Sequence, residues 1–129
     1  MSYQVFKTEK TFLMIKRDSG KLEHIETTVT YAYDYDDCAP DFDYGSDEEN
    51  KKEMKRFESG ELLNLSLKVT AKCLGEYGYE YLGQCFVSSN GAEKELLDIA
   101  SQYDLKNNAC NELKNNILVQ WELMKKHLL

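Results

Sequence analysis

The chain has 129 residues, of which 42% are hydrophobic and 30% are charged, and its formal net charge is −7. This length and composition predict one folded domain spanning residues 1–129 and argue against disorder. No run of 18 apolar residues occurs, and residues 1–10 lack the apolar core of a signal peptide. We therefore expect neither a membrane-spanning nor a secreted protein, but a cytoplasmic one.

The first third of the chain predicts a β-hairpin. Residues 10–17 contain the apolar run Phe-Leu-Met-Ile, which is typical of a strand buried on both faces. Residues 18–21 supply a turn with Gly20 in it. The alternation that follows predicts a second strand, whose apolar side carries Ile25, Val29, Tyr31 and Tyr33.

Residues 34–49, called here the acidic segment, hold eight carboxylates and no lysine or arginine. Their charge of −8 exceeds the charge of the whole chain, because the other 113 residues sum to +1. Pro40 and Gly45 indicate a loop. Charge confined to one stretch creates a local field that selects partners.

A short surface helix is predicted to follow this loop. Ser46 and Glu49 have the spacing of a capping box, and Gly60 is a typical C-terminal stop after Ser59. We expect the basic residues of this helix to form ion pairs one turn apart with its first acids. The basic residues are Lys51, Lys52, Lys55 and Arg56, and the acids are Asp47, Glu48 and Glu49.

The centre of the chain predicts two more strands. Residues 63–73 alternate strictly, with Leu63, Leu65, Leu67, Val69, Ala71 and Cys73 on one side. This period of two indicates one buried and one solvent-facing side. Residues 75–78 turn the chain, and residues 79–87 form an aromatic-rich fourth strand.

The last third of the chain has helical periodicity. Asn90 and Glu93 resemble a capping pair, followed by an apolar stripe of Leu96, Leu97, Ile99, Ala100 and Tyr103. A second helix is predicted from about Asn107. Its broad apolar band at residues 117–124 predicts either deep burial or a homodimer through this helix.

These elements predict an α+β fold: an antiparallel sheet of about four strands, a short surface helix, and two C-terminal helices packed on one face.

Catalytic chemistry is not indicated. The chain has two histidines and none of the common nucleophile, zinc-protease or phosphate-loop motifs. A pair of Cys38 with His24 is formally possible, but Cys73 and Cys85 fall on apolar sides of their strands, as structural cysteines do. The four cysteines have no CxxC spacing, so we expect free thiols, no bound metal and no cofactor.

The charge pattern requires that two ligands, calcium and nucleic acid, be considered. An EF-hand loop that starts at Asp34 or Asp41 fails, because neither register has Gly at position six and Glu at position twelve. A calcium site of another kind, or a carboxylate-based enzyme, remains an alternative. We expect no direct nucleic-acid binding, because the one dense basic patch adjoins the acidic segment.

The acidic segment is the candidate partner-binding surface. Its carboxylates are interleaved with aromatic rings, which supply interface area while the charges steer toward a basic protein surface. The candidate residues are Asp34, Tyr35, Asp36, Asp37, Asp41, Phe42, Asp43, Tyr44, Asp47, Glu48 and Glu49.

Three stretches resemble small uncharacterised proteins of phages and other bacterial mobile elements. They begin at Tyr31 (YAYDYD), Glu58 (ESGEL) and Tyr81 (YLGQC). The third resembles a pattern with two glycines before the cysteine, and Gln84 stands at the second. The resemblance implies an accessory protein such as an anti-CRISPR or anti-restriction inhibitor and maps no binding residue.

The leading hypothesis is a non-enzymatic acidic protein-binding module that inhibits a nucleic-acid-handling host defence protein, in the manner of an anti-CRISPR protein or of a DNA mimic. One alternative is an immunity-type inhibitor of a cognate toxin. The other is the calcium-binding or carboxylate-based enzyme.

Overall fold

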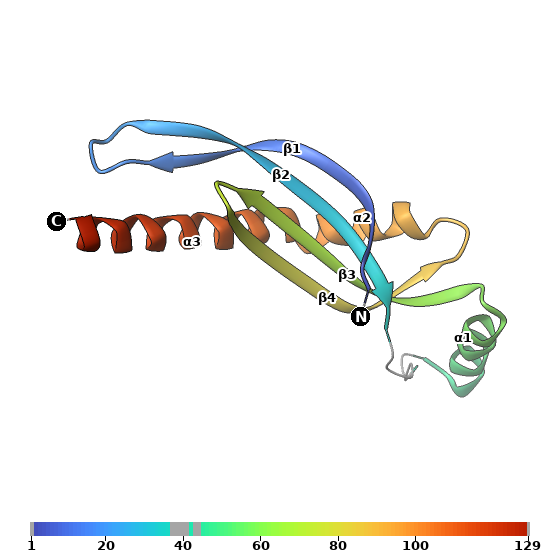
Figure 1. The fold of residues 1–129 in the computed structure, drawn as a ribbon. Helices are drawn as coiled ribbons and strands as arrows, with labels where there is room; N and C mark the ends of the chain where they lie inside the picture. The colour runs from blue at the N-terminus through green and yellow to red at the C-terminus, as the bar shows by residue number, and fades with distance from the viewer. Residues whose placement is uncertain (1, 37–41, 43–44, 129) are drawn as a thin grey trace.

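The computed structural model describes residues 2–36, 42 and 45–128 and confirms the predicted α+β class. Four strands form one antiparallel sheet, and three helices accompany it, the last two of them C-terminal to the strands (Figure 1). In chain order the elements are β1 (Gln4–Lys16), β2 (Leu22–Tyr35), α1 (Asp47–Ser59), β3 (Leu62–Cys73), β4 (Glu76–Ser88), α2 (Ala92–Gln102) and α3 (Leu105–Leu128).

The strands are neighbours in chain order, so the sheet is a simple meander of β1, β2, β3 and β4. The β1–β2 turn contains Gly20, whose φ of 87° favours glycine, as predicted. The β3–β4 turn is tighter than predicted, because Cys73 pairs with Glu76 and only Leu74 and Gly75 lie between the strands. Both turn residues have positive φ, which is the type I′ geometry that matches strand twist.

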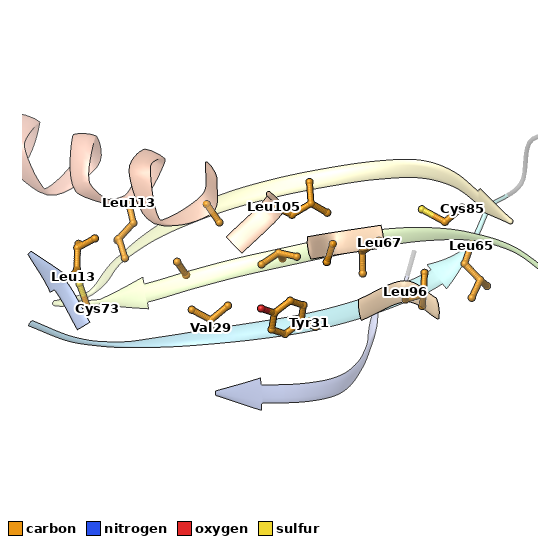
Figure 2. Close-up of a cluster of buried hydrophobic side chains, with 14 of the residues drawn as sticks. Leu13, Val29, Tyr31, Leu65, Leu67, Cys73, Cys85, Leu96, Leu105 and Leu113 are labelled. Carbon is orange, nitrogen blue, oxygen red and sulfur yellow. The ribbon is translucent and has the colours of Figure 1, made fainter. Parts of the chain in front are cut away.

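The core lies between one face of the sheet and the two C-terminal helices. The alternation predicted for β3 is confirmed from Leu65 to Cys73, where every second side chain is buried. In Figure 2 these side chains meet Leu96 of α2 and Leu105 and Leu113 of α3. Because the helices cover only this face, the opposite face of the sheet carries the polar half of each alternation.

Helix α3 approaches β4 so closely that its backbone touches the strand. A Cβ added to Gly78 would overlap the carbonyl oxygen of Ala109 and lie 2.5 Å from the backbone nitrogen of Leu113. Glycine is therefore required here for contact and not for its dihedral freedom. Asn116 continues the same contact, since its side-chain amide donates to the Tyr77 carbonyl at 2.7 Å.

The first prediction concerns this contact. Gly78→Ala should lower the free energy of unfolding by about 2–3 kcal/mol, because α3 must move away from the sheet to admit one methyl group. Urea unfolding followed by circular dichroism measures the change. Gly91→Ala is the matched control, since its Cβ would meet only the ends of the Glu95 and Ser88 side chains. Equal stability of the two variants would contradict the close backbone contact between α3 and β4 at Gly78.

The β1–β2 hairpin is longer than the rest of the sheet. Residues 22–27 of β2 pair with β1 but have no partner on β3, so they form a two-stranded arm. Figure 1 shows the arm extending past the β3–β4 hairpin along the C-terminal half of α3. Leu13 and Ile15 of the arm are buried in the same core as Ile117 of α3. A two-stranded ribbon is marginal alone, so the helix supports it.

Strand β1 corrects one prediction. Residues 10–17 were expected to be buried on both faces, yet Phe12 is 67% and Met14 49% exposed, while Leu13 and Ile15 are buried. The cause is the single helical layer, which covers one face of the sheet. The apolar run therefore has one buried side, with Leu13 and Ile15, and one exposed apolar side, with Phe12 and Met14.

The two C-terminal helices start differently from the prediction. Asn90 is not a cap: α2 begins after Gly91, which makes no side-chain capping bond. Glu95 instead reaches back and accepts hydrogen bonds from the Ser88 backbone amide and hydroxyl. Tyr103 ends α2 and is 54% exposed, so it lies outside the apolar stripe. Helix α3 starts at Leu105, two residues earlier than expected.

Candidate functional site

Helix α1 has the ends that the sequence predicted. The Ser46 hydroxyl accepts from the Glu49 amide at 3.2 Å, and Gly60 stops the helix with a left-handed φ of 86°. None of its residues is buried, which confirms a surface helix. Its first turn carries three exposed carboxylates, at Asp47, Glu48 and Glu49. Acids are favourable at this positive end of the helix dipole.

The predicted ion pairs within α1 are wrong. Among the described residues, none of the carboxylates of Asp47, Glu48 and Glu49 lies in an ion pair. Arg56 contacts Glu53 at 3.0 Å and Glu61 at 3.9 Å instead. The acids of the first turn lie at the positive end of the helix dipole and remain available to a cation from outside.

The other end of the acidic segment lies at the end of β2. Asp34 accepts from the Ser2 amide at 3.0 Å and from the Tyr35 amide at 2.8 Å, and the Tyr35 side chain is 61% exposed. Asp37, Asp41, Asp43 and Tyr44, four of the predicted binding residues, lie outside the described residues. The described part of the acidic segment therefore consists of its two flanks and Phe42.

Asp36 has a structural contact that the sequence did not predict. Leu65 pairs with Cys85 and Leu67 with Leu82, so β4 holds one extra residue and bulges at Gly83 and Gln84. One carboxylate oxygen of Asp36 accepts from the Gln84 amide at 2.9 Å and from the Ser66 hydroxyl at 3.2 Å. Gln84 has a φ of 53°, a conformation that glycine adopts more easily.

Phe42 does not belong to an exposed binding surface. Its side chain is 7% exposed, and its ring centroid lies 5.2 Å from that of Phe86 on β4. Phe86 pairs with Asn64, which is also buried although it lies on the predicted solvent side of β3. Phe42 therefore covers one end of the face opposite the helices and is corrected from a partner-binding to a packing residue.

Of the four cysteines, Cys38 lies outside the described residues, and the other three are poorly suited to nucleophilic attack. Cys73, Cys85 and Cys110 are free thiols, and burial raises the pKa of Cys85 to about 11 and also raises that of Cys110. Thiolates are the nucleophilic form, so a raised pKa works against attack at neutral pH. Within residues 2–36, 42 and 45–128, no three His, Cys, Asp or Glu side chains are grouped to hold a metal ion.

Glu9 is the centre of a charged network that sequence reasoning missed. Its carboxylate accepts from the Tyr31 hydroxyl at 2.8 Å and lies 3.3 Å from the Lys106 ammonium and 3.6 Å from that of Lys7. Burial raises the pKa of Glu9, but these hydrogen bonds and charges outweigh it and hold the pKa below its ordinary value. The network joins β1, β2 and α3.

The second prediction follows from the direction of that shift. Because the pKa of Glu9 is lower in the folded state, its stabilising contribution is present above the ordinary pKa and is lost as pH falls through the folded-state value. Glu9→Gln should therefore destabilise the protein at about pH 7 and have little effect at about pH 3.

Urea unfolding at the two pH values provides the measurement. Asp98→Asn, which neutralises an exposed carboxylate of α2, is the control and should not show this loss. An effect of Glu9→Gln that is equal at both pH values would show that the charged carboxylate is not what stabilises the fold.

The face of the sheet opposite the helices carries a row of tyrosines. We call it the tyrosine face and define it by Tyr3, Lys68, Lys72, Tyr77, Tyr79 and Tyr81. Tyr77 and Tyr79 have ring centroids 5.9 Å apart and planes 6° apart, and Tyr79 and Tyr81 are 6.3 Å and 22° apart. Tyr3 meets Tyr81 edge-on at 6.4 Å.

Two lysines of β3 lie over these rings. The Lys68 nitrogen is 4.9 Å from the ring centroid of Tyr79, 5.4 Å from that of Tyr3 and 5.5 Å from that of Tyr81. The Lys72 nitrogen is 5.3 Å from the ring centroid of Tyr77. Burial, followed by the charges of neighbouring groups, raises the pKa of Tyr3. The alternation of tyrosines at 77, 79 and 81 could have indicated the row of rings from the sequence. The position of the two lysines beside the rings depends on the β3–β4 register, which the sequence does not show.

A groove lies elsewhere, between the tip of the β1–β2 arm and α3. This groove has a volume of about 690 Å³ and is lined by Leu118, Trp121 and Met124 together with charged residues of the turn. Arg17 stacks over the Trp121 ring at 4.1 Å and forms an ion pair with Glu23 at 3.0 Å. Lys125 also pairs with Asp18, so the charges at the rim are matched across the groove.

Comparisons with protein-family models, curated proteins and solved structures find no match. The mobile-element resemblance therefore stays a prediction. Among the described helices, none is long and apolar enough to cross a membrane.

Proposed function

We propose that the protein is a non-enzymatic binding module that uses its acidic segment to engage a basic surface of another protein. The observation that carries the proposal is the first turn of α1, where three exposed carboxylates at Asp47, Glu48 and Glu49 have no ion-pair partner among the described residues. Exposed Tyr35, at the other flank of the segment, supports it by adding aromatic contact area.

The proposed target is a nucleic-acid-handling protein of host defence, as in anti-CRISPR or anti-restriction inhibition. Such proteins present basic surfaces that a row of carboxylates can occupy in place of phosphates. An immunity-type inhibitor of a toxin uses the same chemistry and is the alternative. We also propose a cytoplasmic location, which the free thiols of the described residues support.

The third prediction tests the acidic surface. Asp47→Asn, Glu48→Gln and Glu49→Gln, made together, should slow association with the partner about tenfold at low salt, because charge steering is lost. The partner is first isolated from host lysate on the immobilised chain and identified. Association rates of purified partner with the wild type and the variant are then measured by surface plasmon resonance at two salt concentrations.

The matched control removes three charges from another surface through Glu93→Gln, Asp98→Asn and Glu112→Gln. It should associate at nearly the wild-type rate. Asp36 is left unchanged in both variants because it fixes the β4 bulge. Equal rates for the wild type and both variants would refute the proposal. Loss of capture in the presence of competing DNA would favour a nucleic-acid-handling target over a toxin.

Self-association through α3 is a separate part of the proposal. Val119, Leu123 and Met124 are 56%, 43% and 55% exposed on the C-terminal half of this helix. They account for part of the apolar band at residues 117–124, whose other side is buried at Ile117.

The fourth prediction tests this surface by changing its polarity. If α3 forms a dimer, Val119→Glu with Leu123→Glu should shift the sedimentation coefficient from dimer to monomer and leave the circular dichroism spectrum unchanged. Tyr103→Glu, at an exposed position after α2, is the control. A wild-type chain that sediments as a monomer at all concentrations would remove this part of the proposal.

A further inference from the structure

We propose that the tyrosine face binds single-stranded nucleic acid, a function separate from the protein contact of the acidic segment. The face belongs to the sheet surface that α2 and α3 leave uncovered. Tyr77 and Tyr81 are 38% and 57% exposed there. At its end nearest α1, Phe42 and Phe86 close the surface, so the uncovered part is bounded on that side.

The rings form a continuous row along an edge strand. Residues 77, 79 and 81 alternate onto the same face of β4, and Tyr3 extends the row beyond Tyr81. The ring planes along β4 are near parallel, with angles of 6° and 22°. A row of aromatic rings on an open sheet is the kind of platform on which unpaired bases stack, whatever their sequence.

The lysines beside Tyr77, Tyr79 and Tyr81 favour an anion, whereas the carboxylates of Asp34 and Asp36 act on Tyr3 at the other end of the row. Among the described residues, neither Lys68 nor Lys72 lies in an ion pair, whereas Lys10 on the same face is paired with Glu26 at 3.5 Å. Both free ammonium groups are held over tyrosine rings, so a ligand that stacks on the rings meets two cations. A single strand combines unpaired π faces with phosphates, whereas an acidic peptide supplies only the charge.

The expectation of no nucleic-acid binding rested on the linear density of basic residues. Lys68 and Lys72 are four positions apart and look unremarkable in the sequence. The sheet pairs Lys68 with Tyr81 and Lys72 with Tyr77, which places cation and ring side by side on two strands. A basic and aromatic surface is therefore assembled by strand pairing on a chain whose net charge is −7.

Fluorescence anisotropy of labelled 12-nucleotide strands tests the proposal. Oligo-dT and oligo-rU separate DNA from RNA as the source of the strand, and binding of either supports the proposal. The expected dissociation constant is about 1–100 µM at low salt, with weaker binding of a 12-base-pair duplex. An abasic strand of equal length tests stacking. Equal binding of the abasic strand would overturn the proposal, because charge alone would then explain it.

Variants locate the site. Tyr81→Ala should weaken binding by about fivefold to a hundredfold, the range for loss of one stacked base. Tyr81→Phe keeps the ring and should retain binding. Tyr103→Ala is the matched control, because Tyr103 is 54% exposed but lies at the end of α2. If Tyr81→Ala fails to fold, the lysine variants below locate the site without removing a ring.

Lys68→Gln with Lys72→Gln should weaken binding and reduce the slope of log affinity against log salt by about 1.4, since each phosphate contact contributes about 0.7 for a single strand. Lys51→Gln with Lys52→Gln on α1 removes the same charge and should leave the slope unchanged. No binding by the folded wild type, or equal losses in both lysine variants, would overturn the proposal. The proposal would also be overturned if a partner protein required Tyr81 for binding while no nucleic-acid strand bound.

Discussion

The contact between α3 and β4 at Gly78 is the constraint on which the rest of the structure depends. Helix backbone lies directly against strand backbone there, and the Asn116 amide closes the contact on the Tyr77 carbonyl. This contact positions Leu113 over the sheet and directs the C-terminal half of α3 under the β1–β2 arm. The close approach of α3 to β4 therefore determines the positions of the arm, the groove beside Trp121 and the core.

The same arrangement determines which surfaces are available to ligands. Both C-terminal helices lie on one side of the sheet, so the polar and aromatic alternate residues of β3 and β4 stay uncovered on the other side. Phe42 limits that surface at one end by packing on Phe86. Helix α1, whose first turn carries exposed acids, lies past one end of the sheet (Figure 1), away from Tyr77 at the β3–β4 turn.

Local patterns were sufficient to predict much of the fold. The alternation from Leu65 to Cys73 and the caps of α1 involve neighbours in sequence, and both are confirmed. The exposure of Phe12 depends on which face the helices cover, and the contact of Asp36 with Gln84 joins residues 48 positions apart. The tyrosine face depends on strand register in the same way. Pairing and layer order, which no local pattern reports, account for these errors and omissions.

The order of the elements also has a consequence for synthesis. All four strands leave the ribosome before α2 and α3, so the nascent chain carries the apolar side of β3, with Leu65, Leu67 and Val69, before its helical cover exists. Uncovered sheet surface of this kind is prone to aggregate. The bulge at Gly83 and Gln84 interrupts the outer edge of β4, and such interruptions oppose edge-to-edge pairing between nascent chains.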